Sequence, residues 1–113
     1  MIEWIVRYWD EGKKDKSSLE RWFDRLTNDQ LKSVAKEVKL LGLCGTDLKL
    51  PHSRALGKGL FELRERRYGY RIYYAFEGKM TVVLLNAGDK SSQAKDIPVA
   101  RLRLADLLEN QEG

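Results

Sequence analysis

The chain has 113 residues and a mass of 13.1 kDa, close to the commonest size of one folded domain, so we expect a single domain over residues 1–113. A hydrophobic content of 42%, with three Trp, five Tyr and three Phe, excludes an intrinsically disordered chain. Apolar runs such as Val82–Leu85 are far too short to span a bilayer, and no signal peptide is visible. One Cys and one His cannot build an internal disulfide or a structural zinc site, so we expect a cytosolic protein without metal or cofactor.

Positive charge is concentrated in one stretch of the sequence. The chain carries 21 basic and 17 acidic residues, and its whole excess lies between His52 and Tyr74, a window that also holds five aromatic residues. Arg interleaved with Tyr is typical of polyanion binding, because guanidinium groups pair with phosphate oxygens and aromatic rings stack on bases. The plainer alternative is a solvated basic hairpin that serves only solubility.

The N-terminal half predicts one strand followed by two helices. Residues 2–8 alternate between faces and are rich in β-branched and aromatic side chains, which favours a strand. After a polar turn at 11–16, Ser17 and Thr27 each begin a capping-box pattern. Apolar stripes at helical spacing follow each cap, the second ending at Gly42, and together they predict a helical hairpin. The stripes are Leu19, Trp22, Phe23 and Leu26, then Leu31, Val34, Ala35, Val38 and Leu41.

The C-terminal half predicts an antiparallel sheet and a final helix. Residues 43–59 lack periodicity and indicate a long loop. Alternation and β-branched content then predict three strands, with a tight turn at Tyr68–Gly69, and a helix that begins near Pro98. The order β-αα-βββ-α is that of an α+β domain, with the helical hairpin on one face of a small, mainly antiparallel sheet and the other face free. The three strands are 60–67, 70–76 and 80–86.

Three segments stand in a distinctive order and spacing: Gly59–Arg64, Gly69–Tyr74 and Leu84–Gln93, the last followed by Asp96, Ile97 and Ala100. With Trp22, Phe23 and Leu26 in the first helix, they resemble the RelE/HigB superfamily of toxins, and most of all its phage-derived, HigB-like "addiction module killer" branch. The resemblance implies a RelE-like fold and a metal-independent mRNA endonuclease that acts in the ribosome. It also implies a cognate antitoxin, often with a helix-turn-helix domain, and a higher-order toxin–antitoxin complex.

The resemblance assigns roles to individual residues. Arg71 corresponds to the basic residue after the Gly-Tyr turn, Arg64 to the one that closes the preceding strand, and Lys90 to the one in the loop after the last strand. Metal-free RNA cleavage requires a base, an acid and cations that face the developing charge. We expect Arg64 and Arg71 to clamp one phosphate and Lys90 to stabilise charge or act as a base. His52 is a further acid–base candidate, because its ordinary pKa lies near neutrality.

Other residues of the basic window are candidates for RNA binding. Tyr73 shares the face of Arg71, so it can stack on a base, although burial in the core is the alternative. The arginines of the site can instead pair with Glu62 or Glu65, and Lys90 with Asp89. The RNA-binding candidates are Arg54, Lys58, Arg66, Arg67, Tyr68 and Tyr73.

Two departures from the family pattern open an alternative function. Glu62 stands where some members place a catalytic Lys, and no residue clearly matches the C-terminal catalytic Tyr of the family. A binding protein without nuclease activity is therefore the second hypothesis. It is either a degenerate relative or a topoisomerase poison like the ParE branch.

Overall fold

The computed structural model describes residues 3–9 and 17–112, so the predicted turn at 11–16 lies outside the described residues. Short 3-10 helices at Gly45–Asp47 (η1) and Lys90–Ser92 (η2) supplement the main elements. In chain order these are β1 (Ile5–Tyr8), α1 (Ser18–Asp24), α2 (Asn28–Cys44), β2 (Ser53–Gly57), β3 (Leu60–Glu65), β4 (Tyr70–Glu77), β5 (Thr81–Asp89) and α3 (Gln93–Glu112).

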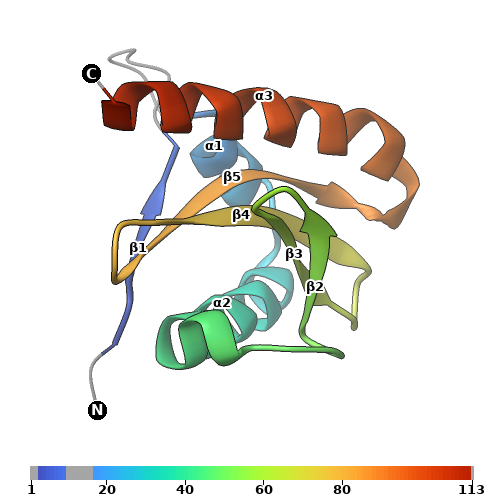
Figure 1. Cartoon of the computed structure of the whole chain (residues 1–113). Coiled ribbons are helices and arrows are strands. Elements are labelled where there is room, and N and C mark those ends of the chain that lie inside the picture. The colour runs from blue at the N-terminus through green and yellow to red at the C-terminus, as the bar shows by residue number, and fades with distance from the viewer. Residues whose placement is uncertain (1–2, 10–16, 113) are drawn as a thin grey trace.

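The strands form one sheet in the order β1-β5-β4-β3-β2, in which only β1 and β5 run parallel. Helices α1 and α2 cover one face, as predicted, and the α+β class is confirmed (Figure 1). The expectation of a free second face is wrong, because α3 lies across it. Its apolar stripe of Ala100, Leu104 and Leu107 packs against Tyr73 and Leu85 of the sheet.

The α1/α2 face holds the larger core. Ile72, Tyr74 and Leu84 of the sheet pack there against Leu19 and Val34 of the helices. Both predicted N-caps are confirmed, since the side chains of Ser17 and Thr27 accept hydrogen bonds from the backbone N–H groups of Glu20 and Gln30. Each cap satisfies a backbone donor that a helix start otherwise leaves without a partner. Sequence periodicity therefore located this face correctly.

The second helix continues past Gly42, the residue at which the sequence predicted its end. Gly42 lies buried inside α2, and its carbonyl accepts a hydrogen bond of 2.8 Å from the backbone N–H of Trp4. The helix ends instead before Gly45, which has φ +53°. A Cβ added to Gly45 would lie 2.0 Å from the Trp4 indole, so this residue allows the segment before β1 to approach the end of α2.

Two other boundaries differ from the sequence prediction. The long loop contains β2, a short edge strand that pairs with β3 and whose mostly exposed residues produce no alternating pattern. Helix α3 begins at Gln93, so Pro98 lies inside it rather than at its start. The chain turns into α3 through η2, which is capped by the side chain of Asp89. That cap, and not the proline, sets where the C-terminal helical segment begins.

A bulge in β5 brings the start of α3 over the sheet. Tyr73 is opposite Asn86 and Tyr74 is opposite Leu84, so Leu85 is an extra residue in β5. The Asn86 side chain then donates a hydrogen bond of 3.0 Å to the backbone carbonyl of Asp96. Two residues further on, a Cβ added to Gly88 would lie 1.9 Å from a carboxylate oxygen of Asp96. This part of the sheet is therefore covered closely by α3.

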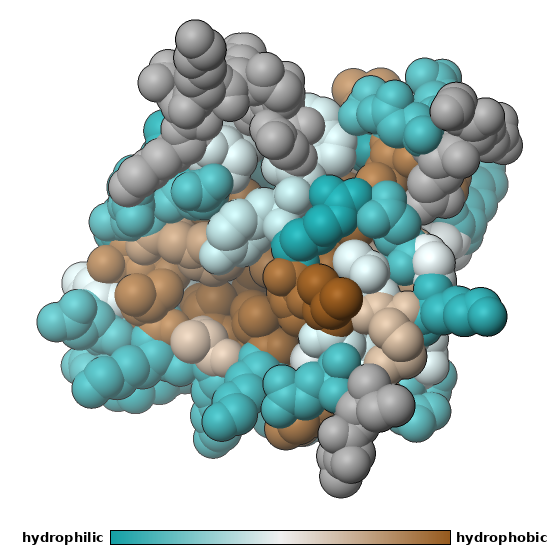
Figure 2. Space-filling model, turned by 90° about the vertical axis from the view of Figure 1, so that its left-hand side faces the viewer, coloured by the Kyte–Doolittle hydropathy of each residue, from teal (hydrophilic) through white to brown (hydrophobic). Residues whose placement is uncertain are grey.

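An apolar groove runs between β1 and the helical hairpin. It encloses about 340 Å³ and is lined by Val6, Tyr8, Phe23, Leu31, Val34, Ala35, Val38 and Leu84. Figure 2 looks onto the β1 side of the molecule and shows apolar residues gathered in a hollowed band across it. None of the helices in residues 17–112 combines the length and apolar character needed to cross a membrane.

Candidate functional site

Two arginines stand directly opposite each other on the α3 face of the sheet. Arg64 of β3 and Arg71 of β4 are Cα partners in the antiparallel register, as predicted. Like charges in directly opposed positions destabilise a sheet unless an anion neutralises them. The sequence predicted an exposed Arg71, but only 7% of it is accessible, because the start of α3 lies over this part of the sheet.

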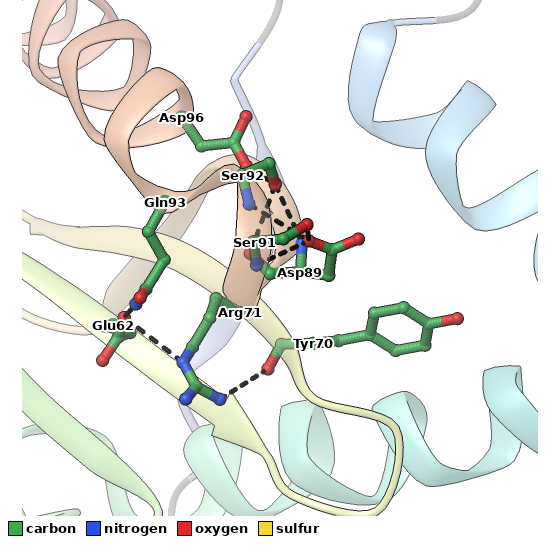
Figure 3. Close-up of polar contacts among 8 residues, drawn as sticks. All are labelled: Glu62, Tyr70, Arg71, Asp89, Ser91, Ser92, Gln93 and Asp96. Atoms are coloured by element: carbon green, nitrogen blue, oxygen red, sulfur yellow. Dashed lines mark hydrogen bonds and ion pairs between the residues drawn. The ribbon is translucent and has the colours of Figure 1, made fainter.

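A buried carboxylate neutralises part of the positive charge of the two arginines. Glu62 is 2% exposed, and its Oε1 lies 3.5 Å from Nε of Arg71. The same oxygen accepts a hydrogen bond of 2.5 Å from the side-chain amide of Gln93, the first residue of α3 (Figure 3). One carboxylate and two arginines therefore share this face of the sheet, and among the described residues only Arg71 is ion-paired with it. Of the two ion pairs considered for these arginines, the one with Glu62 is present, whereas Glu65 points to the other face.

Three buried polar atoms on this face have no hydrogen-bond partner. They are Nε of Arg64, Nε of Arg71 and the hydroxyl oxygen of Tyr73. A buried polar group without a partner costs about 1–3 kcal/mol, so native structures contain few of them. Their concentration among neighbouring side chains makes this face the candidate site for an anionic or hydrogen-bonding ligand.

Tyr73 is fully buried, so of its two predicted placements the structure shows packing in the core and not an exposed stacking surface. Burial raises the pKa of Tyr73 to about 12, and the nearby carboxylates of Glu62 and Asp96 act in the same direction. The phenol therefore stays protonated at neutral pH. It can donate a hydrogen bond or a proton, but it cannot serve as a base.

Lys90 lies beside the β3–β4 turn, directly after the end of β5. Its backbone N–H donates a hydrogen bond of 3.0 Å to the carbonyl of Gly69, and its side chain is exposed. Asp89, the preceding residue, directs its carboxylate to the backbone N–H groups of Ser91 and Ser92, and hydrogen bonding lowers the pKa of Asp89. Within the described residues no ion pair links Asp89 to Lys90, so the alternative that Lys90 only pairs with Asp89 is not found.

The β3–β4 turn carries further basic and aromatic candidates. Arg66 and Arg67 are exposed there, and the guanidinium of Arg67 lies 5.1 Å from the ring centroid of Tyr68. Arg54 is exposed on β2 opposite Glu62, so it extends the α3 face of the sheet. Lys58 is exposed in the β2–β3 turn, with φ 54°. Of these residues only Arg54 shares the face of the arginine pair, because Arg66 and Arg67 border α2 and Lys58 lies at the other end of β3.

The side chain of His52 points away from the arginine pair, although its carbonyl accepts a hydrogen bond of 2.8 Å from the backbone N–H of Arg64. Its Nδ1 is 3.0 Å from a carboxylate oxygen of Glu37 on α2, on the opposite side of the sheet from Arg71. The structure therefore places the imidazole of His52 on the opposite side of the sheet from the side chains of Arg64 and Arg71. Sequence reasoning chose it for its ordinary pKa, which says nothing of the face on which a loop residue lies.

Gln93 and Asn86 belong to the site but escaped sequence reasoning. Gln93 contacts the site only because α3 begins there, and Asn86 turns toward α3 only because of the bulge in β5. Both positions depend on tertiary structure. No cluster of three metal-ligating side chains occurs among residues 3–9 and 17–112, and the polar groups present can bind an anion and move protons.

Comparison with known proteins identifies the chain as a toxin of the RelE/HigB type. Residues 21–108 match the family described as "Phage derived protein Gp49-like (DUF891)", and the chain belongs to that family. It is 32% identical over 104 residues to "Putative toxin HigB3" of Mycobacterium tuberculosis, covering 84% of this chain and 91% of that protein.

Two further comparisons give a second relative in sequence and a match of the fold. An uncharacterized protein of Haemophilus influenzae is 35% identical over 94 residues, which cover 80% of this chain and 89% of that protein. A mutant of the Escherichia coli toxin RelE in the free state superposes with a TM-score of 0.57 at 14% identity. This superposition covers 82% of this chain and 87% of RelE, and it confirms the RelE-like fold.

Proposed function

We propose that the protein is the toxin of a type II toxin–antitoxin module and an endoribonuclease that cleaves mRNA in the ribosome without a metal. The observation that carries this proposal is the opposed pair Arg64 and Arg71, whose buried Nε atoms have no hydrogen-bond partner. A phosphate between them would accept from both guanidinium groups and neutralise the charge that Glu62 alone does not balance.

The same geometry suggests how the phosphodiester is cleaved. The 2′-hydroxyl attacks the adjacent phosphorus as it loses its proton, and the 5′-oxygen of the next nucleotide leaves as it gains one. Arg64 and Arg71 face the charge that develops on the non-bridging oxygens, and Lys90 adds a third cation at the rim. Glu62 can accept the proton of the 2′-hydroxyl, and the protonated Tyr73 can give a proton to the leaving 5′-oxygen.

Induced expression in a bacterial host tests this function directly. We expect growth arrest and truncation of transcripts inside coding regions. An Arg64→Gln/Arg71→Gln variant at equal protein level should leave transcripts intact. Intact transcripts and continuing translation with the unmodified chain would contradict the proposal.

A second candidate function is a binding protein without nuclease activity, such as a topoisomerase poison. Glu62 favours this second function. Its buried carboxylate, ion-paired with Arg71, stands at the position where some family members have a lysine. In-vitro translation separates the two functions. A ribosomal nuclease stops translation directly, whereas a topoisomerase poison leaves translation intact and damages DNA.

We also propose an antitoxin partner, with a helix-turn-helix domain as in related modules, that assembles with the toxin into a higher-order complex. Two surfaces support this: the apolar groove between β1 and α2, and the basic residues around Arg64 and Arg71. An antitoxin segment with apolar and acidic residues fits both. Binding that is insensitive to salt and to charge reversal at Arg64 would show that inhibition does not involve the site.

A further inference from the structure

A second basic surface lies on the other side of the sheet from Arg71, along α2 (Figure 1). Two adjoining hollows of about 420 Å³ and 230 Å³ share the residues Lys36, Glu37 and Arg66. Together they form a groove, here called the α2 groove, between α2 and the β3–β4 turn. His52 lines its far end.

Five basic residues border the α2 groove. Lys32, Lys36 and Lys39 share one face of α2, since they are spaced four and three residues apart and span about 10 Å of helix. Arg66 and Arg67 lie on the opposite wall. All five are exposed, and none of them forms an ion pair within residues 3–9 and 17–112.

The carboxylates of the groove are mostly directed elsewhere. Glu65 is buried and accepts from the backbone N–H groups of Arg67 and Tyr68. The carboxylate of Glu37 is paired with His52, whose Nδ1 lies 3.0 Å from Oε2 of Glu37. Asp29 lies in the first turn of α2, at the end of the groove, where a helix N-terminus favours negative charge. The surface that faces solvent is therefore dominated by the five basic residues.

The two walls of the groove are held at a fixed separation. The hydroxyl of Ser33 on α2 donates a hydrogen bond of 3.0 Å to Oε1 of Glu65, and the same carboxylate fixes the backbone of the turn. The side chains of Arg66 and Lys36 therefore project from a preformed frame. A surface that needs no rearrangement loses less entropy when it binds.

We infer that the α2 groove binds the sugar-phosphate backbone of a folded, double-stranded RNA. Lysines spaced along a helix opposite arginines on a turn match a rigid row of phosphates and offer little for reading base edges, so recognition is independent of sequence. This inference rests on the proposed function and deepens it. The α2 groove would hold structured RNA while the Arg64/Arg71 site, on the other side of the sheet, receives the single strand to be cleaved.

The test measures binding to an RNA duplex of about 16 base pairs over a series of salt concentrations, in filter-binding or fluorescence titrations. The variant K32Q/K36Q removes two charges from the groove. The control K79Q/K95Q removes two exposed lysines from outside it. Melting temperatures of both variants confirm that each remains folded.

For K32Q/K36Q we expect the slope of log binding constant against log salt to fall by about 1.8, with at least about a tenfold loss of affinity at 0.1 M salt. The control should stay within a few tenths of the unmodified slope. Equal slopes for the groove variant and the unmodified chain would overturn the inference. Equal losses of duplex affinity in both variants would also overturn it. So would a K32Q/K36Q variant that binds the duplex normally and is weakened only in binding to a polyglutamate peptide.

The outcome does not depend on cleavage. A duplex offers no single strand to the Arg64/Arg71 site, so affinity can be measured even if the chain is not a nuclease. If it is one, K32Q/K36Q should lose cleavage of ribosome-bound message along with its affinity for the duplex, whereas K79Q/K95Q should cleave at the unmodified rate. Failure of the nuclease proposal and failure of this inference are therefore separate results.

Discussion

Glu62 and Glu65 lie three residues apart on β3, yet they face opposite sides of the sheet. Both are buried, with 2% and 1% of their surface exposed. Glu65 accepts hydrogen bonds from a serine hydroxyl and two backbone N–H groups, all at 3.0 Å or less. Glu62 is held by the side chains of Arg71 and Gln93, and the arginine contact is longer, at 3.5 Å.

The two faces of the sheet differ in the same way as these two carboxylates. On the α1/α2 face, the Tyr74 hydroxyl is hydrogen bonded to Ser53, and the buried polar groups serve the fold. On the α3 face, the Tyr73 hydroxyl and two arginine Nε atoms have no hydrogen-bond partner among residues 3–9 and 17–112, and the Arg71 Nε has only its ion pair with Glu62. Because such atoms cost stability, their retention on one face points to a role in binding.

Arg71→Ala should produce the largest effect. Loss of one preorganised donor to a developing oxyanion typically lowers the rate by about 100- to 1000-fold. The variant should also be destabilised by about 3 kcal/mol, because it leaves Glu62 buried without its cation. Transcript cleavage and the free energy of unfolding should be measured on the same preparation.

The double variant Arg71→Ala/Glu62→Gln is the control for that result. It removes the unbalanced carboxylate, so stability should recover while activity stays low. Recovery of activity together with stability would mean that Arg71 acts only through the fold.

Glu65→Gln should reduce stability by about 2 kcal/mol, because an amide oxygen replaces a charged acceptor of three hydrogen bonds. Activity per folded molecule should change little. Chemical denaturation gives the first quantity, and cleavage normalised to folded protein gives the second. A strong loss of normalised activity with unchanged stability would reverse the roles assigned to the two faces.

Tyr73→Phe should separate stability from function. The hydroxyl has no hydrogen-bond partner, so its removal should leave stability unchanged or raise it by up to about 1 kcal/mol. Cleavage should fall by about tenfold if the hydroxyl contacts the phosphate. A loss of stability would show that the hydroxyl has a structural partner.

The same variant should change the alkaline pH dependence of stability. The folded-state pKa of Tyr73 is raised to about 12 from 10.0, so its contribution is present below pH 10 and is lost between pH 10 and 12. The free energy of unfolding, measured with urea over this pH range, should decline less steeply with pH for Tyr73→Phe than for the unmodified chain. An identical decline in both chains would contradict the assigned burial.

Lys90→Gln should have the smallest effect. The side chain is exposed, so stability should stay within about 0.5 kcal/mol of the unmodified chain. Activity should fall only several-fold, because solvent screens a rim charge. A loss as large as that of Arg71→Ala would identify Lys90 as a member of the reacting centre.

The sequence predicted the α1/α2 face well and the α3 face poorly. Capping residues and apolar stripes are local signals, so Ser17, Thr27 and the hairpin were predicted correctly. Alternation also placed Arg64 and Arg71 on one face. Their burial was not predictable, because it depends on where α3 begins, and that depends on the Asp89 cap and the bulge in β5.

The pairing of β1 with β5 has a consequence for the order in which the chain folds. Ile5 pairs with Thr81, so the first strand finds its place only after most of the chain has been synthesised. Until then, the apolar face of the helical hairpin has no β5 to pack against. Contacts so distant in sequence form slowly, and exposed apolar segments associate with other chains. The newly made protein therefore passes through a stage at which a chaperone or partner can capture it before the site exists.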